Sequence, residues 1–142
     1  PGVFVPIWDD PLMTFNDDTF GGDMLACAGA RNVFADRQRL YPLAADLGKS
    51  AAAVATGRDT RYPRITLAEL ETRAPAIVLL PDEPHEYGAA DLARFAALPI
   101  PAAARGAIAL CSGKDLFWYG AWSVDALPRL QALVTGLVRP GP

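Results

Sequence analysis

The sequence contains little cysteine and histidine. Cys27 and Cys111 lie far apart and outside any Cys-x-x-Cys pair, and His85 is the single histidine in 142 residues. Because zinc sites gather several such ligands, no zinc site is expected. A reaction that relies on a histidine base has little else to use. We expect both cysteines to be small, buried apolar residues, and the sequence leaves open whether they form a disulfide.

Long apolar runs and dense positive charge are absent as well. No apolar run approaches the roughly 20 residues that span a membrane. The first residues, PGVFVPIW, lack the charged and apolar regions of a signal peptide, so we expect any targeting signal to lie outside this sequence. The 13 lysine and arginine residues are scattered, which argues against the basic stripe of a nucleic-acid-binding protein.

What the sequence does contain is typical of one globular domain. Hydrophobic residues make up 51% of the chain and charged residues 20%, and the formal net charge is −3. A chain of 142 residues is long enough for a single core and too short for two full-sized ones. The hydrophobic share argues against disorder. We therefore expect a single domain over residues 1–142.

Apolar, strand-like runs alternate with helical segments along the chain. The pattern predicts strands at residues 3–7, 32–34, 76–80 and 107–111. It predicts helices at residues 19–28, 67–73, 89–97 and 124–138, with a turn or short helix between 40 and 57. Such alternation is typical of an α/β domain with a mostly parallel sheet. We expect a three-layer αβα sandwich in which the last two predicted strands are buried.

Several helix ends carry recognisable signals. Asp18 or Thr19 is placed to cap the first predicted helix. Thr66, followed three residues later by Glu69, predicts a capping box in which each side chain satisfies a backbone N–H at the helix start. Pro128 is expected in the first turn of the last helix, because a proline further inside removes a hydrogen bond.

Aromatic side chains gather in or beside the segments that follow the predicted strands: Trp8, Phe15, Tyr62, Phe117, Trp118, Tyr119 and Trp122. In a parallel α/β sheet, the loops at the carboxyl ends of the strands form the natural binding crevice. Flat side chains there suit a large, partly apolar ligand. Packing beneath loops is an equally good interpretation for any one of these residues, so the prediction rests on the group.

Motifs for bond-making chemistry are missing. A group of acidic and amide residues does not alternate as a calcium loop requires, so turn and cap roles are expected for Asp9, Asp10, Asn16, Asp17, Asp18 and Asp23. Ser112 stands in CSGK, which is neither a nucleophile elbow nor a phosphate-binding loop. We predict no catalytic residue, no metal site and no cofactor, and therefore a protein that is not an enzyme.

One alternative function comes from the order of charged residues. Asp9 and Asp10 follow the first predicted strand, Asp82 follows the third, and Lys114 follows the fourth. This is the order of groups in a phosphoacceptor receiver domain. A receiver needs a helix directly after the acid pair, whereas Pro11 at that place favours a loop. A receiver-like signalling domain is kept as the alternative.

Three segments together are similar to a known family: PIWDDPLMTFNDDTFGGDMLACAGARNVF, YPRITLAELETRAPAIVLLPDEP and GKDLFWYGAWSVDALPRL. In this order, and over almost the whole chain, they resemble the carboxyl-terminal lobe of helical-backbone periplasmic binding proteins for cobalamin, haem and iron siderophores. The resemblance implies one α/β lobe of a two-lobe receptor, in which VFVPIW is the first strand. It also implies that the amino-terminal lobe and the secretion signal lie outside this sequence.

The resemblance, together with the aromatic group, supplies the predicted ligand-binding residues: Trp8, Met13, Phe15, Tyr62, Asp115, Phe117 and Trp118. Tyr62 stands where relatives place an aromatic residue that packs against the ligand. Asp115 stands where relatives that bind cobalamin present an acid. Many relatives have an arginine near the position of Trp122, which would favour a carboxylate-bearing ligand. Without that arginine, the resemblance leaves the ligand open.

The resemblance also implies a contact with a membrane permease. Relatives often expose a docking glutamate at the start of the helix after YPRIT, whereas this chain has Ala68 there. The candidate acids are Glu69, Glu71 and Glu83. We expect Glu69 to be held in the capping box, which leaves Glu71 or Glu83 as the exposed docking residue.

The implied function is that of a solute receptor for an ABC importer. Such a receptor would be periplasmic or otherwise extracytoplasmic, and an anchor could hold it at the membrane. It would capture cobalamin or a related metal chelate, such as haem or a ferric siderophore, and deliver it to the permease. Its partners would be the chelate, the permease and the amino-terminal lobe. Because exposed apolar surfaces tend to be covered, a dimer or crystal contact over Trp8, Tyr62 and Trp118 is expected.

Overall fold

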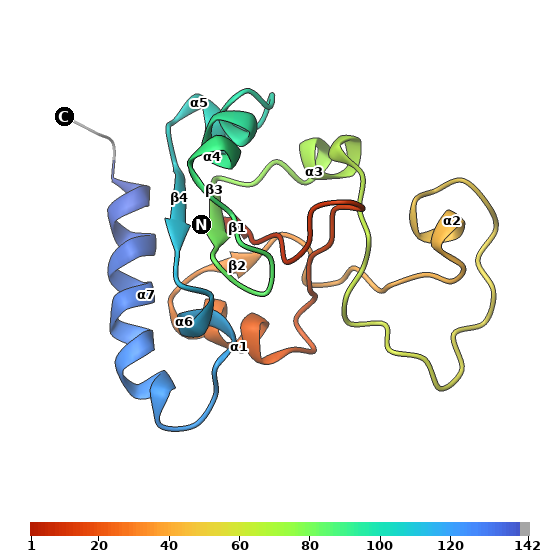
Figure 1. Cartoon of the computed structure of the whole chain (residues 1–142), viewed down its shortest axis with the longest axis horizontal. Coiled ribbons are helices and arrows are strands. Elements are labelled where there is room, and N and C mark those ends of the chain that lie inside the picture. The colour runs from red at the N-terminus through yellow and green to blue at the C-terminus, as the bar shows by residue number, and fades with distance from the viewer. Residues whose placement is uncertain (140–142) are drawn as a thin grey trace.

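Four short parallel strands form the centre of the fold (Figure 1), as seen in a computed structural model that describes residues 1–139. The strands are β1 (Gly2–Phe4), β2 (Arg31–Asn32), β3 (Ile77–Pro81) and β4 (Ile108–Cys111), paired in the order β2-β1-β3-β4. The helices are α1 (Phe20–Cys27), α2 (Leu43–Asp46), α3 (Leu67–Arg73), α4 (Ala89–Ala96), α5 (Pro101–Ala104), α6 (Gly113–Phe117) and α7 (Trp122–Val138).

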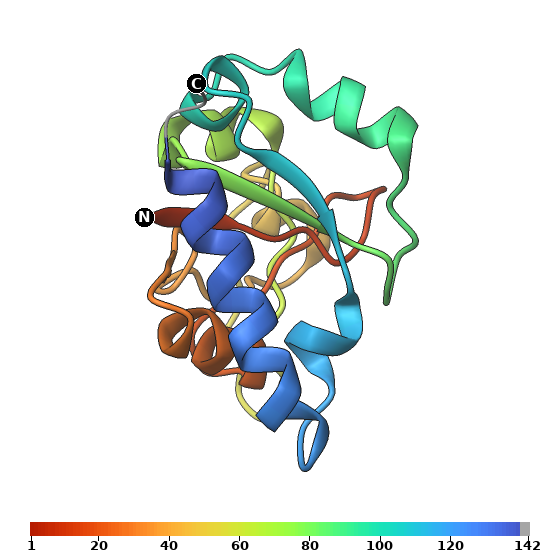
Figure 2. The same ribbon diagram turned by 90° about the vertical axis from the view of Figure 1, so that its left-hand side faces the viewer.

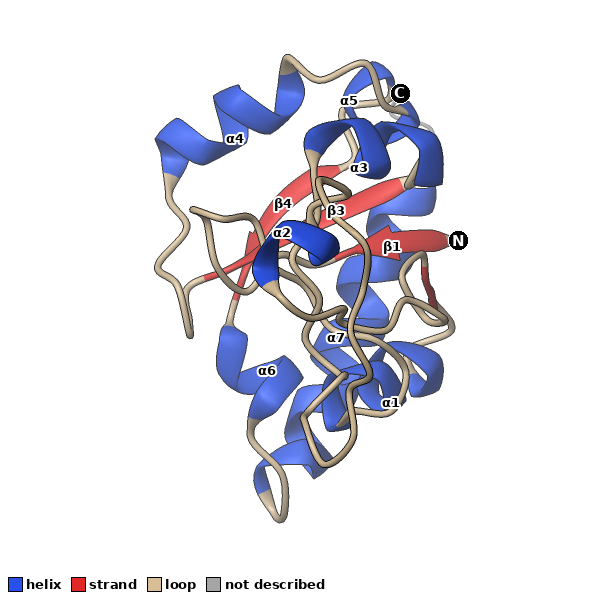
Figure 3. Cartoon of the chain, turned by 90° about the vertical axis from the view of Figure 1, so that its right-hand side faces the viewer, coloured by secondary structure: helices blue, strands red, loops and turns tan. Residues whose placement is uncertain are grey.

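Helices cover both faces of this sheet, and each face has its own hydrophobic core. Side chains that alternate along the strands point to opposite faces. One core packs strand residues against α1, α6 and α7, and includes Val3, Leu79, Leu25, Leu116 and Leu130. The other packs them against α3, α4 and α5, and includes Phe4, Val78, Leu70, Phe95 and Ala102. Figure 2 shows α7 crossing the first face, and Figure 3 shows the second face with α3 and α4. The predicted three-layer αβα sandwich with a parallel sheet is confirmed.

The first two strands are shorter or placed differently than the sequence predicts. β1 ends at Phe4 because the following segment folds back on itself: the Ile7 amide donates to the Met13 carbonyl at 2.8 Å, and the Met13 amide donates to the Trp8 carbonyl at 3.0 Å. β2 ends at Asn32, whose side-chain oxygen accepts the Phe34 amide at 2.9 Å and turns the chain. The predicted strands at 3–7 and 32–34 were therefore wrong in their ends.

β4 is an edge strand, so the prediction that it is buried was wrong. The strand order places β3 between β1 and β4, and every residue of β3 is buried. On the outer side of β4, no further strand is paired within residues 1–139, and Leu110 is 43% exposed. An apolar run predicts a strand, but its place in the sheet depends on how the remaining strands pair.

The last helix begins two residues before its predicted start, at Trp122, which places Pro128 in the second turn. The expectation of a first-turn proline was therefore wrong. Proline lacks the N–H that would bond to the carbonyl of Val124, four residues earlier. Val124 is exposed, so water can reach that region of the helix in place of the missing donor. The helix continues to Val138 and packs Leu130 and Val134 into the core.

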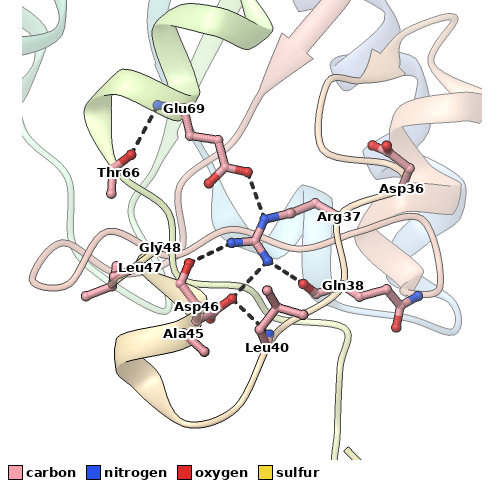
Figure 4. A pocket seen from close by; sticks show the side chains of 10 residues that line it. All are labelled: Asp36, Arg37, Gln38, Leu40, Ala45, Asp46, Leu47, Gly48, Thr66 and Glu69. Atoms are coloured by element: carbon pink, nitrogen blue, oxygen red, sulfur yellow. Dashed lines mark hydrogen bonds and ion pairs between the residues drawn. The ribbon is translucent and has the colours of Figure 1, made fainter. Parts of the chain in front are cut away.

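The predicted N-terminal caps are present, but one of them is not a full capping box. The Thr19 hydroxyl accepts the Gly22 amide at 3.1 Å, and the Thr66 hydroxyl accepts the Glu69 amide at 3.1 Å. The Glu69 carboxylate does not return to the helix start. It accepts a hydrogen bond from Arg37 at 2.7 Å instead (Figure 4). The expected reciprocal role of Glu69 was therefore wrong, because a cation from another segment reaches its carboxylate.

The two cysteines are not paired with each other and differ in their surroundings. Cys27 is exposed on α1, so its predicted burial was wrong, and Cys111 is half-buried at the end of β4. Burial, with smaller contributions from Asp82 and Asp115, raises the pKa of the Cys111 thiol to about 12. Cys111 therefore stays a protonated thiol at neutral pH.

Candidate functional site

A hollow of about 610 Å³ lies at the carboxyl ends of the parallel strands. It is lined by residues from segments that follow β1, β3 and β4 and from the segment before α3: Ile7, Tyr62, Glu83, Pro84, Phe117 and Trp118. Crevices at this edge of a parallel sheet are the usual binding sites of open α/β folds. This position makes the hollow the candidate functional site.

Aromatic rings form much of the wall of this hollow. Phe117 ends α6 and Trp118 follows it, so the two residues are carried by the short helix that begins directly after β4. Phe117 meets the buried ring of Phe15 edge to face, with the ring centroids 5.6 Å apart. Tyr62 reaches the same wall from the segment that leads to α3. Three aromatic residues of the predicted group, Tyr62, Phe117 and Trp118, are thus brought together.

Trp118 is 46% exposed and is held by polar neighbours on two sides. Its indole N–H donates to the Glu83 carboxylate at 2.5 Å. The Lys114 ammonium lies 4.7 Å from the centre of its ring, within the range of a cation–π contact. The Trp122 ring lies 5.8 Å from it. A large flat surface is thereby kept at the mouth of the hollow in a fixed orientation.

Asp115, predicted to present an acid to the ligand, is 9% exposed and engaged within the chain. Its carboxylate accepts two hydrogen bonds from Arg129, at 2.6 and 2.9 Å, and one from the Trp122 indole at 3.1 Å. The hydrogen bonds from Arg129, followed by that from Trp122, hold the pKa of Asp115 below its ordinary value despite burial. The carboxylate is therefore ionised at neutral pH, and it ties α6 to α7.

The remaining predicted ligand-binding residues lie near the hollow but not in its lining. Trp8 is 48% exposed and meets the His85 ring edge to face at 5.6 Å. Met13 is half-buried and pairs with Trp8 and Arg64 through isolated bridges. Phe15 is 1% exposed and belongs to the core. Whether these residues contact a ligand remains a prediction.

A smaller hollow of about 270 Å³ adjoins the first and shares two of its walls. Its lining comes from the start of α1 and the aromatic residues around it: Phe15, Thr19, Phe20, Gly21, Arg61, Tyr62, Phe117 and Tyr119. Arg61 is the cation in this lining, and it pairs with Asp59 at 2.9 Å. Tyr62 and Phe117 separate the two hollows, so a change at either residue alters both.

A third hollow, of about 400 Å³, surrounds Arg37 in the segment that follows β2 (Figure 4). The guanidinium of Arg37 donates to Asp46 at 2.9 Å and to Glu69 at 2.7 Å. Asp46 also accepts the backbone amides of Leu40 and Arg64 at 2.9 and 2.7 Å. Because these charged groups satisfy one another, we interpret the third hollow as the surroundings of a structural ion cluster that holds the segment around α2 in place.

The three predicted docking acids have different surroundings. Glu69 is held by Arg37, and Glu83 is held by Trp118. Glu71 is exposed on α3, and within residues 1–139 its carboxylate has no ion pair. Chain order places α3 before β3, toward the end of the sheet opposite the main hollow (Figure 1). Of the three candidates, Glu71 is therefore the one that the fold leaves available.

The charged groups of the alternative receiver-like function are engaged separately. Asp9 pairs with Arg94 at 2.5 Å, Asp82 accepts the Gly113 amide at 2.7 Å, and Lys114 lies against Trp118. No group of three acidic, histidine or cysteine side chains in the described part of the chain is placed to hold a metal ion. The geometry therefore does not favour the receiver-like alternative.

Sequence reasoning missed parts of the main hollow. Glu83 was considered only for docking, and Ile7 and Pro84 were not considered. A signal for Glu83 and Pro84 was present, because both follow a predicted buried strand, where the crevice rule places binding residues. Arg129 had no such signal. Its contact with Asp115 joins residues 14 positions apart and depends on the turn between α6 and α7.

No family model matches this chain, and no curated protein matches it in sequence. Solved structures do match its fold. The periplasmic vitamin B12 binding protein BtuF of Vibrio cholerae has a TM-score of 0.63 at 13% identity, with 96% of this chain and 44% of that chain covered. The periplasmic heme-binding protein RhuT from Roseiflexus sp. RS-1 has a TM-score of 0.67 at 16% identity, with 98% and 47% covered.

A third similar structure is the periplasmic heme-binding protein BhuT in complex with two hemes, with a TM-score of 0.68 at 20% identity. Here 98% of this chain and 46% of that chain are covered. The chain therefore spans less than half the length of each of these three structures. Among the helices of residues 1–139, none is both long and apolar enough to cross a membrane. The chain has the α/β fold that makes up one part of these periplasmic binding proteins.

Proposed function

We propose that this chain is the carboxyl-terminal ligand-binding lobe of a solute receptor for an ABC importer, which captures a flat metal chelate and performs no bond chemistry. The observation that carries the proposal is the hollow of about 610 Å³ at the carboxyl ends of the strands, with Tyr62, Phe117 and Trp118 in its wall. The proteins of similar fold that are named for vitamin B12 and heme support a macrocycle such as cobalamin or haem. A ferric siderophore, whose octahedral iron complex is not flat, is the alternative ligand and would replace the macrocycle if neither cobalamin nor haem binds.

The chemistry of the wall suits such a ligand. A corrin or porphyrin has a broad face, and aromatic stacking contributes about 0.5–1.5 kcal/mol per ring pair beyond area burial. The hollow is open to solvent, so a bound macrocycle would stay partly exposed until a second lobe closes on it. Because losing half of the contacts weakens binding steeply, we expect dissociation constants of roughly micromolar or weaker for this chain by itself.

The partners and the location follow from the same proposal. The receptor would work outside the cytoplasm, as the periplasmic proteins of similar fold do. Its partners would be the chelate, a second lobe and a membrane permease. Glu71 is our candidate for the permease contact, because it is the exposed acid of the three.

Equilibrium dialysis with cyanocobalamin and haemin tests the proposal, since each macrocycle can be followed by its own absorbance. We expect Trp118→Ala and Tyr62→Ala each to raise the dissociation constant by about two- to tenfold, the equivalent of one lost stacking contact. Leu67→Ala is the matched control, because Leu67 is about as exposed as Trp118 but lies on α3. Loss of binding in the control as well, or saturable binding of neither macrocycle, would contradict the proposed ligand class.

A further inference from the structure

The lining of the main hollow contains one acidic side chain. Of its lining residues, Ile7, Pro84, Phe117 and Trp118 carry no ionisable side chain, and Tyr62 is a phenol. Glu83 is the carboxylate among them. The fixed charge that a ligand meets in this wall is therefore negative.

Within residues 1–139, one oxygen of this carboxylate is engaged by the protein and the other is not. Oε1 of Glu83 accepts the Trp118 indole N–H at 2.5 Å. In the described part of the chain, Oε2 accepts no hydrogen bond from the protein. An indole offers a single donor and no acceptor, so this bond fixes the edge of the Trp118 ring while a second acceptor oxygen stays beside the hollow.

The position of Glu83 is set by a close backbone contact. A Cβ atom at Gly113 would overlap the Glu83 carbonyl oxygen and its Cγ atom, so only glycine allows the loop after β3 to approach the start of α6 this closely. The neighbouring Asp82 accepts the Gly113 amide at 2.7 Å. Glu83 and the helix that carries Trp118 are thus held as one unit, which orients the carboxylate before any ligand arrives.

Positive charges lie near the hollow without lining it. Arg61 lies 5.4 Å from the ring centre of Tyr62 and is paired with Asp59. The Lys114 ammonium lies 4.7 Å from the Trp118 ring centre and 5.9 Å from the Trp122 ring centre. Arg129 lies against Trp122 at 5.4 Å and is paired with Asp115. Lys114 and Arg129 therefore support the tryptophan pair, and none of the three cations is a lining residue that could receive an anionic ligand group.

We propose that Glu83 is a specificity-determining residue: Oε1 holds Trp118 in place, and Oε2 accepts a hydrogen bond from the ligand. This inference rests on the proposed function and narrows it. The site would select a macrocycle whose edge carries hydrogen-bond donors, such as the primary amides of a corrin. It would disfavour a macrocycle whose edge carries carboxylates, because like charges repel more strongly where water is partly excluded.

The test compares two macrocycles that carry different groups at their edge, amides in one and carboxylates in the other. The dissociation constants of cyanocobalamin, which carries amides, and haemin, which carries two carboxylates, are measured for the native chain, Glu83→Gln and Glu86→Gln. Glutamine keeps an oxygen for the Trp118 indole but removes the charge. Glu86 is an exposed acid of the same loop outside the lining, which makes it the matched control.

For the native chain we expect cyanocobalamin to bind more tightly than haemin. In Glu83→Gln, the ratio of the haemin to the cyanocobalamin dissociation constant should fall by about tenfold, the effect of removing one like charge from a partly buried contact. In Glu86→Gln the ratio should not change. If both macrocycles bind and the ratio is the same in all three proteins, the role of Glu83 is refuted while the proposed function stands. If neither macrocycle binds the native chain, the proposed function fails, and this inference fails with it.

A second measurement tests the positioning of Trp118 without any ligand. The Trp118 share of the fluorescence is defined as the part lost in Trp118→Phe, and its quenching by acrylamide reports how freely the ring moves. We expect Glu83→Ala to increase this quenching and Glu83→Gln to leave it close to the native value. Equal quenching in Glu83→Ala and the native chain would refute the positioning role.

Discussion

At the scale of single residues, Gly113 is the described glycine at which an added Cβ atom would come closest to a neighbouring atom, 2.3 Å from the Glu83 carbonyl oxygen. It is buried at the first position of α6, and a side chain there would meet the backbone of Glu83 rather than the flexible end of another side chain. Backbone cannot move aside without displacing the loop after β3. Because Gly113 has a hydrogen atom where other residues have a Cβ atom, the loop after β3 and the start of α6 can approach each other closely. These two segments form part of the wall of the main hollow.

We predict that Gly113→Ala lowers the free energy of unfolding by about 1–3 kcal/mol, the usual cost of overpacking. The measurement is urea denaturation followed by far-UV circular dichroism. Gly136→Ala is the control: Gly136 is exposed in α7, and a Cβ atom there would meet nothing within 4 Å. Because alanine favours a helix interior over glycine, the control should gain roughly 0.5–1 kcal/mol. A Gly113→Ala protein as stable as the native chain would show that the loop can relax away from α6.

At the scale of secondary-structure elements, the long segment between β2 and α3 depends on one ion cluster. The segment carries the four-residue helix α2 and few buried apolar residues. Arg37 lies near the start of this segment. Its guanidinium joins Asp46, at the end of α2, to Glu69 on α3 (Figure 4). The Asp46 side chain is fully buried, so its charge needs the partners that surround it.

We predict that Arg37→Met lowers the free energy of unfolding by about 3 kcal/mol, since it leaves a buried carboxylate with two backbone amides but no cation. Trypsin should also cleave faster at the exposed Lys49 in the same segment. Arg58→Met is charge-matched. In the part of the chain that the structure describes, the Arg58 guanidinium makes a cation–π contact, 4.8 Å from the Tyr41 ring centre, and no ion pair, so this variant should cost about 0.5–1 kcal/mol at most. Equal losses in the two variants would mean that net charge, and not the buried pair, explains the effect.

The same elements show what sequence patterns predict and what they do not. The helix at 67–73 was predicted to the residue because Thr66 caps it and Pro75 follows it, and both signals are local. The exposure of β4 was not predicted, because it depends on the order of all the strands. In the site, Tyr62, Phe117 and Trp118 of the predicted aromatic group line the main hollow, and their contact with a ligand stays a prediction. The bond between Glu83 and Trp118 joins residues 35 positions apart, and no local pattern records it.

At the scale of the whole molecule, the fold separates the two surfaces that the proposed function uses. The main hollow lies at the carboxyl ends of the strands, beside α6. Helix α3 leads into β3 and lies toward the opposite end of the sheet (Figure 1). A partner that contacts α3 would therefore leave the hollow open. This separation makes ligand capture and permease docking independently testable.

Charge reversal of Glu71 tests the docking surface in cells that produce the complete receptor and its permease. Under the proposed function, we predict that Glu71→Arg lowers ligand uptake by about tenfold or more, because reversing the charge of the docking residue would remove its electrostatic complementarity with the permease and slow association. The dissociation constant of the ligand should not change, since Glu71 lies outside the lining of the hollow. Glu86→Arg is the control, because Glu86 is equally acidic and exposed but follows β3 at the other end of the sheet. Native uptake in Glu71→Arg, or the same loss in Glu86→Arg, would mean that α3 is not the surface that meets the permease.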